Sequence, residues 1–261
     1  MFFMSQNLKK AKNRFLITGT SSGLGKYLHE NLDGTGWNRQ TSVKEREEIK
    51  KNGEEIIIHC AFNSEREPEN LDQYFKDNVL LTDELTKVPH KKFIFISSVD
   101  VYPKNSKQHA EDEVINLHEI DGLYGATKFI SEQLVRKNCS NFLILRCSAL
   151  LGKDSRKNSL FKIIKNDKPT LTLSEKSIFN YVLHIDVLAF IKLSIRNDLT
   201  GIYNLTSSKN ITLKEVAALF KKKVKFGSFL YNVGNIDNKK VALASSYFKK
   251  TSEEVIRQFL K

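Results

Sequence analysis

The stretch RFLITGTSSGLG, residues 14–25, decides the fold. A short apolar run leads directly into a turn that carries Gly19, Gly23 and Gly25. Glycines permit a tight turn and a close approach of backbone to ligand, and the N-terminus of the following helix attracts phosphate. We therefore predict a buried strand, a phosphate-binding turn and a helix that runs to about residue 32.

Outward from this stretch, apolar runs alternate with charged segments of helical character. Further buried strands are predicted at 55–61, 92–97 and 141–146, and helices at 43–51, 68–87 and 124–137. A turn is expected at 33–36 and a short second strand at 37–41. Strands that alternate with helices indicate an α/β fold, a Rossmann-type doubly wound parallel sheet.

The pattern loosens after residue 150, where the elements become short and irregular. They are a helix at 158–166, a strand at 170–173, a mixed segment at 182–195, a strand at 201–205, and a helix opened by a capping box at 212–215. We predict a dinucleotide-binding Rossmann core over 1–150. A smaller C-terminal substrate-binding lobe over 151–261 interleaves with it in one continuous fold.

Composition narrows the class of protein. The 261 residues are 40% hydrophobic and 28% charged, as in globular proteins, and no apolar run reaches the ~20 residues that span a bilayer. The opening MFFM is too short for a signal peptide. Neither the cysteines nor the histidines have metal-ligand spacing, so we predict no metal site and reduced thiols in the cytoplasm.

The net charge of +12 fits either a polyanion partner or dispersed lysines. The dispersion of the basic residues favours the second reading, with no nucleic-acid or membrane partner.

Tyr124 and Lys128 are the candidate catalytic pair. Four residues apart, they share one face of a helix, where the ammonium can lower the pKa of the phenol. Ser98 ends an apolar run upstream. The alternative is an ordinary amphipathic helix with a half-buried tyrosine, and the presence of Ser98 favours catalysis.

The cofactor preference rests on the second strand, which often ends in an acidic residue that holds the ribose of NAD. The stretch WNRQ, residues 37–40, carries Arg39 and no carboxylate. A guanidinium there suits a 2′-phosphate, so NADP is favoured over NAD. The residues of the turn that we expect to bind cofactor are Gly19, Ser21, Ser22, Gly23, Leu24 and Gly25.

Several motifs together resemble the short-chain dehydrogenase/reductase superfamily, in particular its extended branch of nucleotide-sugar epimerases, dehydratases and reductases. They are TGTSSGLG at 18–25, IIIHCA at 56–61, FIFISSVDVY at 93–102, YGATK at 124–128, ILR at 144–146 with Gly152, YVLHIDV at 181–187 and GIYNL at 201–205.

The resemblance implies roles for individual residues. Tyr124 would be the acid/base, Lys128 would assist it and bind the nicotinamide ribose, and Ser98 would bind the reacting oxygen. Ala61, Phe62 and Cys147 would lie along the cofactor. Asp100 would be a second acid/base or a turn residue. The Asp-Glu pair of dehydratases is only half present, which argues against 4,6-dehydration.

The implied function is an NAD(P)-dependent oxidoreductase or epimerase that acts on a nucleotide-diphosphate sugar. Keto-sugar reduction, as in dTDP-4-keto-sugar reductases, and C4 epimerisation both remain open. A reductase of other carbonyl compounds and a non-catalytic NADP-binding sensor are the alternatives. Phe179 stands where relatives often place an arginine that holds substrate. Helices 70–87 and 124–138 would form the seam of a homodimer.

Overall fold

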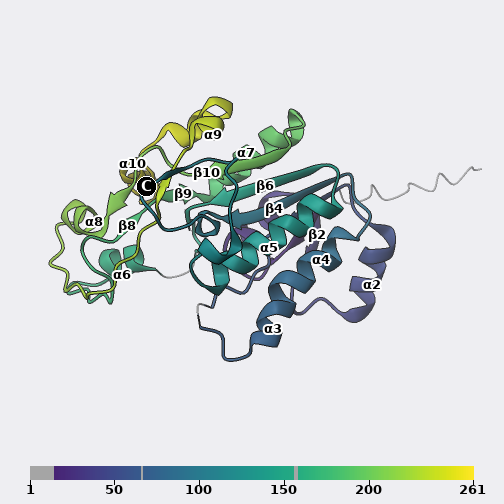
Figure 1. Cartoon of the computed structure of the whole chain (residues 1–261), viewed down its shortest axis with the longest axis horizontal. Helices are drawn as coiled ribbons and strands as arrows, with labels where there is room; N and C mark the ends of the chain where they lie inside the picture. The colour runs from purple at the N-terminus through teal and green to yellow at the C-terminus, as the bar shows by residue number, and fades with distance from the viewer. Residues whose placement is uncertain (1–14, 66, 156–157) are drawn as a thin grey trace, which may run out of the picture.

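A six-stranded parallel sheet forms the centre of the molecule in the computed structural model, which describes residues 15–65, 67–155 and 158–261 (Figure 1). In spatial order its strands are β10 (Gly201–Leu205), β6 (Phe142–Cys147), β4 (Lys92–Ser98), β3 (Ile56–His59), β1 (Phe15–Thr18) and β2 (Gly34–Trp37). Every residue of β1, β3 and β4 is buried, as apolar strands of a covered parallel sheet require. The predicted doubly wound α/β fold is confirmed.

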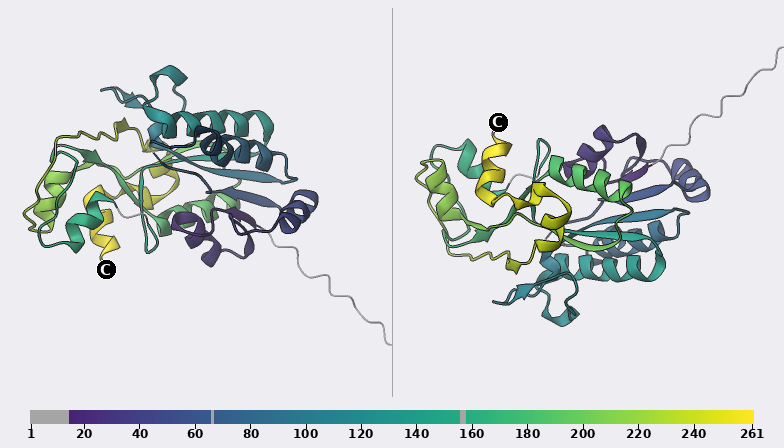
Figure 2. Two further views of the ribbon diagram at one scale, coloured as in Figure 1. Left: turned by 90° about the horizontal axis from the view of Figure 1, so that it is seen from below. Right: turned by 90° about the horizontal axis from the view of Figure 1, so that it is seen from above.

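Helices cover both faces of the sheet (Figure 2). On one face, α1 (Gly23–Asn31) and α7 (His184–Arg196) pack against the strands through side chains such as Leu28 and Phe190. On the other face lie α2 (Val43–Asn52), α4 (Leu81–Thr86) and α5 (Gly122–Asn138), which bury Ile49, Leu85 and Val135. Two hydrophobic cores therefore sandwich the sheet.

The helix predicted at 68–87 begins three residues late, where Asn70 caps α3 (Leu71–Phe75). A π-helical segment, η1 (Lys76–Leu80), joins α3 to α4 without a break. The helix predicted at 124–137 is confirmed as α5.

The second strand was placed wrongly. β2 spans Gly34–Trp37, the segment expected to be a turn, and the expected strand at 37–41 is mostly turn and bend. Gly34 pairs with Phe15, and a Cβ on Gly34 would lie 2.7 Å from the Phe15 carbonyl oxygen. The glycine is there to let two strands approach, and not to turn the chain.

A smaller lobe stands at the carboxyl ends of the strands. Its own core buries residues such as Leu160 and Val216. It consists of β7 (Ala149–Leu151) paired with β9 (Tyr181–Leu183), β8 (Ile178–Phe179) paired with β11 (Ile211–Thr212), α6 (Ser159–Lys165), α8 (Leu213–Leu219) and α10 (Ser252–Phe259). The strand predicted at 170–173 is wrong, since Thr170 and Leu173 form only isolated bridges.

Late segments of the chain return to the core. β12 (Asn235–Ile236) pairs with β5 (Gln108–His109), and α9 (Lys239–Ala244) follows it. Strand β10, from beyond residue 150, completes the main sheet. The remaining short helices are η2 (Val99–Val101), η3 (Leu117–Glu119) and η4 (Ser246–Lys249). The division at residue 150 stays a prediction, and the two parts interleave.

Within the described ranges, no helix combines the length and the apolar composition needed to cross a bilayer. The opening MFFM, judged too short for a signal peptide, lies outside the described residues.

Candidate active site

The glycine turn is shaped by contacts that only glycine allows. Gly19 has φ +74°, and a Cβ there would lie 2.8 Å from the Ala61 nitrogen. A Cβ on Gly25 would lie 2.4 Å from the Gly19 carbonyl oxygen, so helix α1 starts directly against the turn. The turn is an open cradle of backbone at a helix N-terminus, and it fits the pyrophosphate of a dinucleotide.

The buried His59, at the end of β3, supports this turn through hydrogen bonds. Its ring nitrogens lie 2.7 Å from Thr18 Oγ1 and 3.0 Å from Thr82 Oγ1, and Thr18 Oγ1 also accepts the Ala61 amide at 3.0 Å. Burial lowers the pKa of His59 to about 3, with the Lys128 charge adding to the effect. His59 is therefore a core residue with both ring nitrogens hydrogen-bonded.

A cavity of about 750 Å³ lies beside the turn, over the end of β2. Ser21, Ser22 and Arg39 line it, as does Arg46 from α2. The Arg39 side chain is 82% exposed and pairs with Asp77 at 2.8 Å. The Arg46 guanidinium carbon lies 5.3 Å from the centre of the Trp37 ring, and Nη2 donates to the Asn38 carbonyl at 2.9 Å. Sequence reasoning missed Arg46, although its place on a predicted helix just after the second strand was a usable signal.

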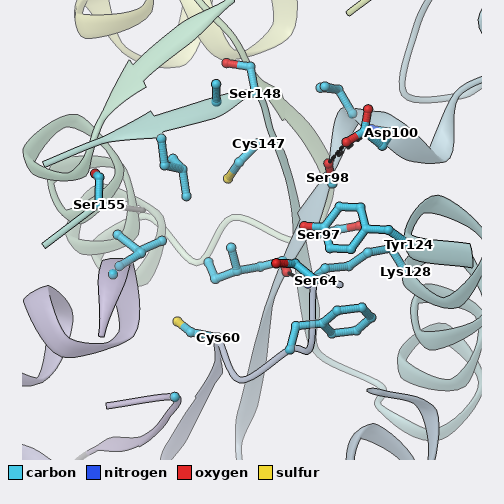
Figure 3. A pocket seen from close by; sticks show the side chains of 18 of the residues that line it. Cys60, Ser64, Ser97, Ser98, Asp100, Tyr124, Lys128, Cys147, Ser148 and Ser155 are labelled. Carbon is cyan, nitrogen blue, oxygen red and sulfur yellow. Dashed lines mark hydrogen bonds between the residues drawn. The ribbon is translucent and has the colours of Figure 1, made fainter. Parts of the chain in front are cut away.

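A second cavity, of about 420 Å³, continues from the same turn toward the lobe (Figure 3). It shares Gly19, Ser22, Ala61 and Phe62 with the first, so the two form one groove along the carboxyl ends of the strands. Besides these four, the predicted residues that line it are Gly23, Leu24, Gly25, Ser98, Asp100, Tyr124, Lys128 and Cys147.

Tyr124 and Lys128 reach the groove from the first two turns of α5 (Figure 3). Lys128 is only 3% exposed, and its Nζ donates to the Ile96 carbonyl at 2.6 Å. The ammonium also lies 3.7 Å from the centre of the Phe62 ring. The Phe62 and Tyr124 rings are perpendicular, with their centres 5.8 Å apart. A carbonyl and an aromatic face both favour the charged amine.

Ser98 ends β4 on the facing wall. Its hydroxyl accepts the Asp100 amide at 3.1 Å and lies 3.3 Å from Asp100 Oδ2. Gly125 explains why α5 can approach this loop, since a Cβ on Gly125 would lie 2.2 Å from the Asp100 carbonyl oxygen. Ser98 and Asp100 are thereby held beside the Tyr124 end of the helix.

A buried ion pair ties α5 to the sheet. Glu132 on α5 accepts from Arg146 Nη2 at 2.7 Å and from Ser97 Oγ at 2.5 Å, and both charged residues are at most 2% exposed. Arg146 Nη1 donates to Tyr102 Oη at 2.7 Å. The Tyr102 hydroxyl in turn donates to Asn204 Oδ1 of β10 at 2.9 Å. This network fixes the helix that carries Tyr124.

The thiols at the groove are neutral. Burial raises the pKa of Cys60 and of Cys147 to about 12, against a partial lowering by the Lys128 charge. Cys139 is also free, and burial raises its pKa to about 11. Within the described part of the chain, no cluster of three or more His, Cys, Asp or Glu residues could hold a metal ion.

The substrate side of the cavity contains residues that sequence reasoning did not assign to the site. They are Ser64, Leu150, Ser155, Asn158, His184 and Tyr231, which lie there together with Phe179. His184, at the start of α7, is packed so closely that a Cβ on Gly152 would lie 2.2 Å from its Nδ1. Burial lowers the pKa of His184 to about 4, partly opposed by the Asp154 charge. These residues come from distant segments, and only the HID motif around His184 could have signalled one of them.

Comparison with known proteins gives a family. Residues 15–205 match the family described as "NAD dependent epimerase/dehydratase family". A curated relative is the sterol-4-alpha-carboxylate 3-dehydrogenase, decarboxylating, of Dictyostelium discoideum, 27% identical across 81% of this chain and 76% of that protein.

Solved structures share the fold. The dTDP-4-dehydrorhamnose reductase of Bacillus anthracis, in complex with NADP, gives a TM-score of 0.78 at 20% identity, covering 96% of this chain and 99% of that one. The UDP-glucuronic acid 4-epimerase of Bacillus cereus, in complex with NAD, gives 0.73 at 16% identity, covering 95% and 99%. At these identities the likeness concerns the fold alone.

Proposed function

The chain belongs to the NAD-dependent epimerase/dehydratase family, and we propose that it is an NAD(P)-dependent oxidoreductase or epimerase acting on a nucleotide-diphosphate sugar. The observation that carries the proposal is the convergence of Ser98, Tyr124 and Lys128 on one cavity that continues into the glycine cradle. The structural neighbours that bind or convert nucleotide sugars support the substrate class by analogy of fold.

In this proposal the side chains of the protein transfer a proton to or from the substrate, and a bound nicotinamide would supply or accept a hydride. Tyr124 exchanges the proton with the substrate oxygen. The buried ammonium of Lys128 favours the phenolate and thus makes Tyr124 a better acid/base near neutral pH. Ser98 donates a hydrogen bond to the same oxygen as charge develops on it.

We favour NADP over NAD because two guanidinium groups, Arg39 and Arg46, line the cavity over the end of β2. A 2′-phosphate there would replace the exposed Arg39–Asp77 contact with a charge-assisted hydrogen bond. NAD is the alternative, since the acidic partner Asp77 lines the same cavity.

A polar substrate suits the cavity better than a sterol. Hydroxyl and amide side chains line the cavity, among them Ser64, Ser148, Ser155 and Asn158. Ser148, Ser155 and Asn158 already have partners within the chain, namely Asn180, His184 and the Phe161 amide. A sugar can add hydrogen bonds to these polar groups, whereas a sterol would cover them with apolar surface. This lining favours a sugar over the sterol of the curated relative. Keto-sugar reduction and C4 epimerisation both use this arrangement.

We further propose a cytoplasmic homodimer. Leu71 and Leu80 on the continuous helix of α3, η1 and α4 are 51% and 56% exposed, and α4 packs beside α5. Exposed leucines along adjacent helices suit burial against a second copy.

The test is turnover of nucleotide sugars, followed by nicotinamide absorbance with NADP(H) and NAD(H). Tyr124→Phe should reduce kcat by at least about 10³-fold while the Kd for NADP changes only a few-fold. Tyr247→Phe, an exposed tyrosine far from the groove, is the control and should behave as wild type.

Unchanged turnover in Tyr124→Phe would end the catalytic assignment. Cofactor binding without turnover of any carbonyl or alcohol would favour a non-catalytic sensor. Turnover of simple carbonyl compounds alone would favour a general carbonyl reductase.

A further inference from the structure

Asp100 is the point where the C-terminal lobe touches the core beside the reaction centre. Its Oδ1 pairs with Lys104 Nζ at 2.9 Å and accepts from Tyr231 Oη at 3.3 Å. Tyr231 comes from the segment that leads into β12, and its ring lies 4.7 Å from that of Phe179 of β8. One carboxylate oxygen is therefore held from the core and from the lobe at once.

The other oxygen, Oδ2, lies on the cavity side next to Ser98 (Figure 3). It receives the Ser98 hydroxyl at 3.3 Å. A serine hydroxyl has one hydrogen, so once it turns to the reacting oxygen, Oδ2 is free to accept from a substrate hydroxyl. The Lys104 side chain, which holds the other oxygen, is 17% exposed. A carboxylate accepts hydrogen bonds and does not donate them.

We propose that Asp100 Oδ2 accepts a hydrogen bond from a substrate hydroxyl that neighbours the reacting carbon, and that Lys104 and Tyr231 position the carboxylate for this contact. The inference rests on the proposed function, because Ser98 must bind the reacting oxygen. Asp100 then selects substrates that carry a vicinal hydroxyl.

The spacing supports a pair of neighbouring oxygens. Ser98 Oγ and Asp100 Oδ2 are 3.3 Å apart, comparable with the separation of two oxygens on adjacent carbons of a sugar ring. If the reacting oxygen lies against Ser98, the next hydroxyl along the ring reaches Asp100. A hydroxyl donates and a carboxylate accepts, so the polarity matches.

The surrounding wall suits the rest of such a ring. Phe179 and Tyr231 both line the cavity near Asp100 and present aromatic surface. Aromatic faces pack on the C–H face of a sugar, while a carboxylate takes the hydroxyls at its edge. The aromatic wall comes from the lobe, and the position of the Asp100 carboxylate depends on Tyr231 of the lobe. In this inference the lobe therefore determines substrate specificity.

The experiment couples a side-chain change to the removal of one hydroxyl. Wild type and Asp100→Asn, saturated with NADP or NAD, are titrated by calorimetry with UDP-glucose, dTDP-glucose and their 2-, 3-, 4- and 6-deoxy analogues. Asparagine keeps the shape and loses the charge. We expect Asp100→Asn to lower the affinity for the parent sugar about 10- to 100-fold. One deoxy analogue lacks the hydroxyl that Asp100 binds, so wild type should bind this analogue about as weakly as Asp100→Asn binds the parent sugar. The affinity for that analogue should be the same in wild type and variant.

Two further variants test positioning. Tyr231→Phe and Lys104→Gln should raise KM several-fold with kcat nearly unchanged, and Lys104→Arg should recover most of the affinity. Tyr247→Phe is again the control. Equal thermal unfolding midpoints would separate this effect from a loss of fold.

The outcomes are distinct. If Asp100→Asn weakens the parent and every deoxy analogue by the same factor, or weakens none, the inference is wrong and the proposed function stands. If wild type with bound cofactor takes up neither nucleotide sugar, the proposed function fails and the inference falls with it.

Discussion

The two halves of the groove are built in different ways. The proposed cofactor half is formed largely by short runs of residues at the ends of buried parallel strands, with Gly19 and Gly25 in contacts that exclude any side chain. The substrate half is assembled from distant segments, such as Tyr231 and Asp100, which are 131 positions apart and touch through one hydrogen bond of 3.3 Å. The first half is fixed by backbone, the second by side chains. Changes in substrate specificity are therefore easier to reach than changes in cofactor chemistry.

The largest effect should come from the buried ion pair of Glu132 and Arg146, which ties α5 to the sheet. In Glu132→Gln the Arg146 guanidinium loses its carboxylate in a site without solvent, so unfolding free energy should fall by about 3–5 kcal/mol. Urea denaturation measures it. The double variant Glu132→Leu with Arg146→Met should recover much of the loss, and a double variant no better than the single one would show that the pair is not the cause.

A glycine comparison tests whether backbone contacts define the cofactor half. Gly19 and Gly122 share φ +74°, but only at Gly19 would a Cβ meet backbone atoms, whereas at Gly122 nothing lies within 4 Å. Gly19→Ala should cost about 3 kcal/mol and abolish NADP binding, while Gly122→Ala should cost about 1 kcal/mol through backbone strain alone. Equal costs would mean that strain, and not the contact with Ala61, governs the turn.

Acid should weaken both halves, each through one buried histidine. The pKa of His59 is lowered to about 3 and that of His184 to about 4. Both imidazoles are neutral when folded and take up a proton when unfolded, so stability is complete above the unfolded pKa near 6.5 and is lost as pH falls toward these values.

At pH 5 each histidine should cost about 2 kcal/mol relative to pH 7.5. Urea denaturation across this range, with His59→Gln and His184→Gln as non-titrating variants, separates the two contributions. Each variant should show a shallower pH dependence than wild type. A slope that neither variant changes would assign the acid sensitivity to other groups.

The smallest effect concerns cofactor choice. Arg39→Ala should weaken NADP about 10-fold more than NAD, because the exposed guanidinium would meet only the 2′-phosphate. Arg46→Ala is the matched variant on the other side of the same cavity. Fluorescence titration with the reduced cofactors NADPH and NADH measures the affinities of both variants. Equal losses for the two cofactors would remove the phosphate argument.

The sequence predicted the strands and the glycine turn of the cofactor half well because their signals are local, whereas the roles assigned to the site residues stay predictions. The turn, the apolar runs at β3 and β4, and the spacing of Tyr124 and Lys128 are all readable within a few residues. The second strand was misplaced because Gly34 and Gly36 have the composition of a turn, and their closeness to β1 depends on pairing with Phe15.

The substrate half could not be read in the same way. Nothing local to Tyr231 indicates that it reaches Asp100, because that contact depends on the path of the chain from β11 to β12. Arg46 was overlooked because a charged helix usually presents arginines to solvent, and only the position of Trp37 brings this one to the groove. A sequence pattern does not show which side chains from distant segments come together in the folded protein.

The pairing of β12 with β5 has a consequence for synthesis of the chain on the ribosome. Domains tend to fold from the N-terminus as they emerge. The glycine turn, β3, β4 and α5 emerge first, whereas the segment that carries Tyr231 and β12 follows almost a hundred residues after α5. Under the proposed function, the nascent chain would form its dinucleotide turn before the ribosome has synthesised Tyr231. Cellular cofactor levels would then affect the yield of folded protein as well as the reaction rate.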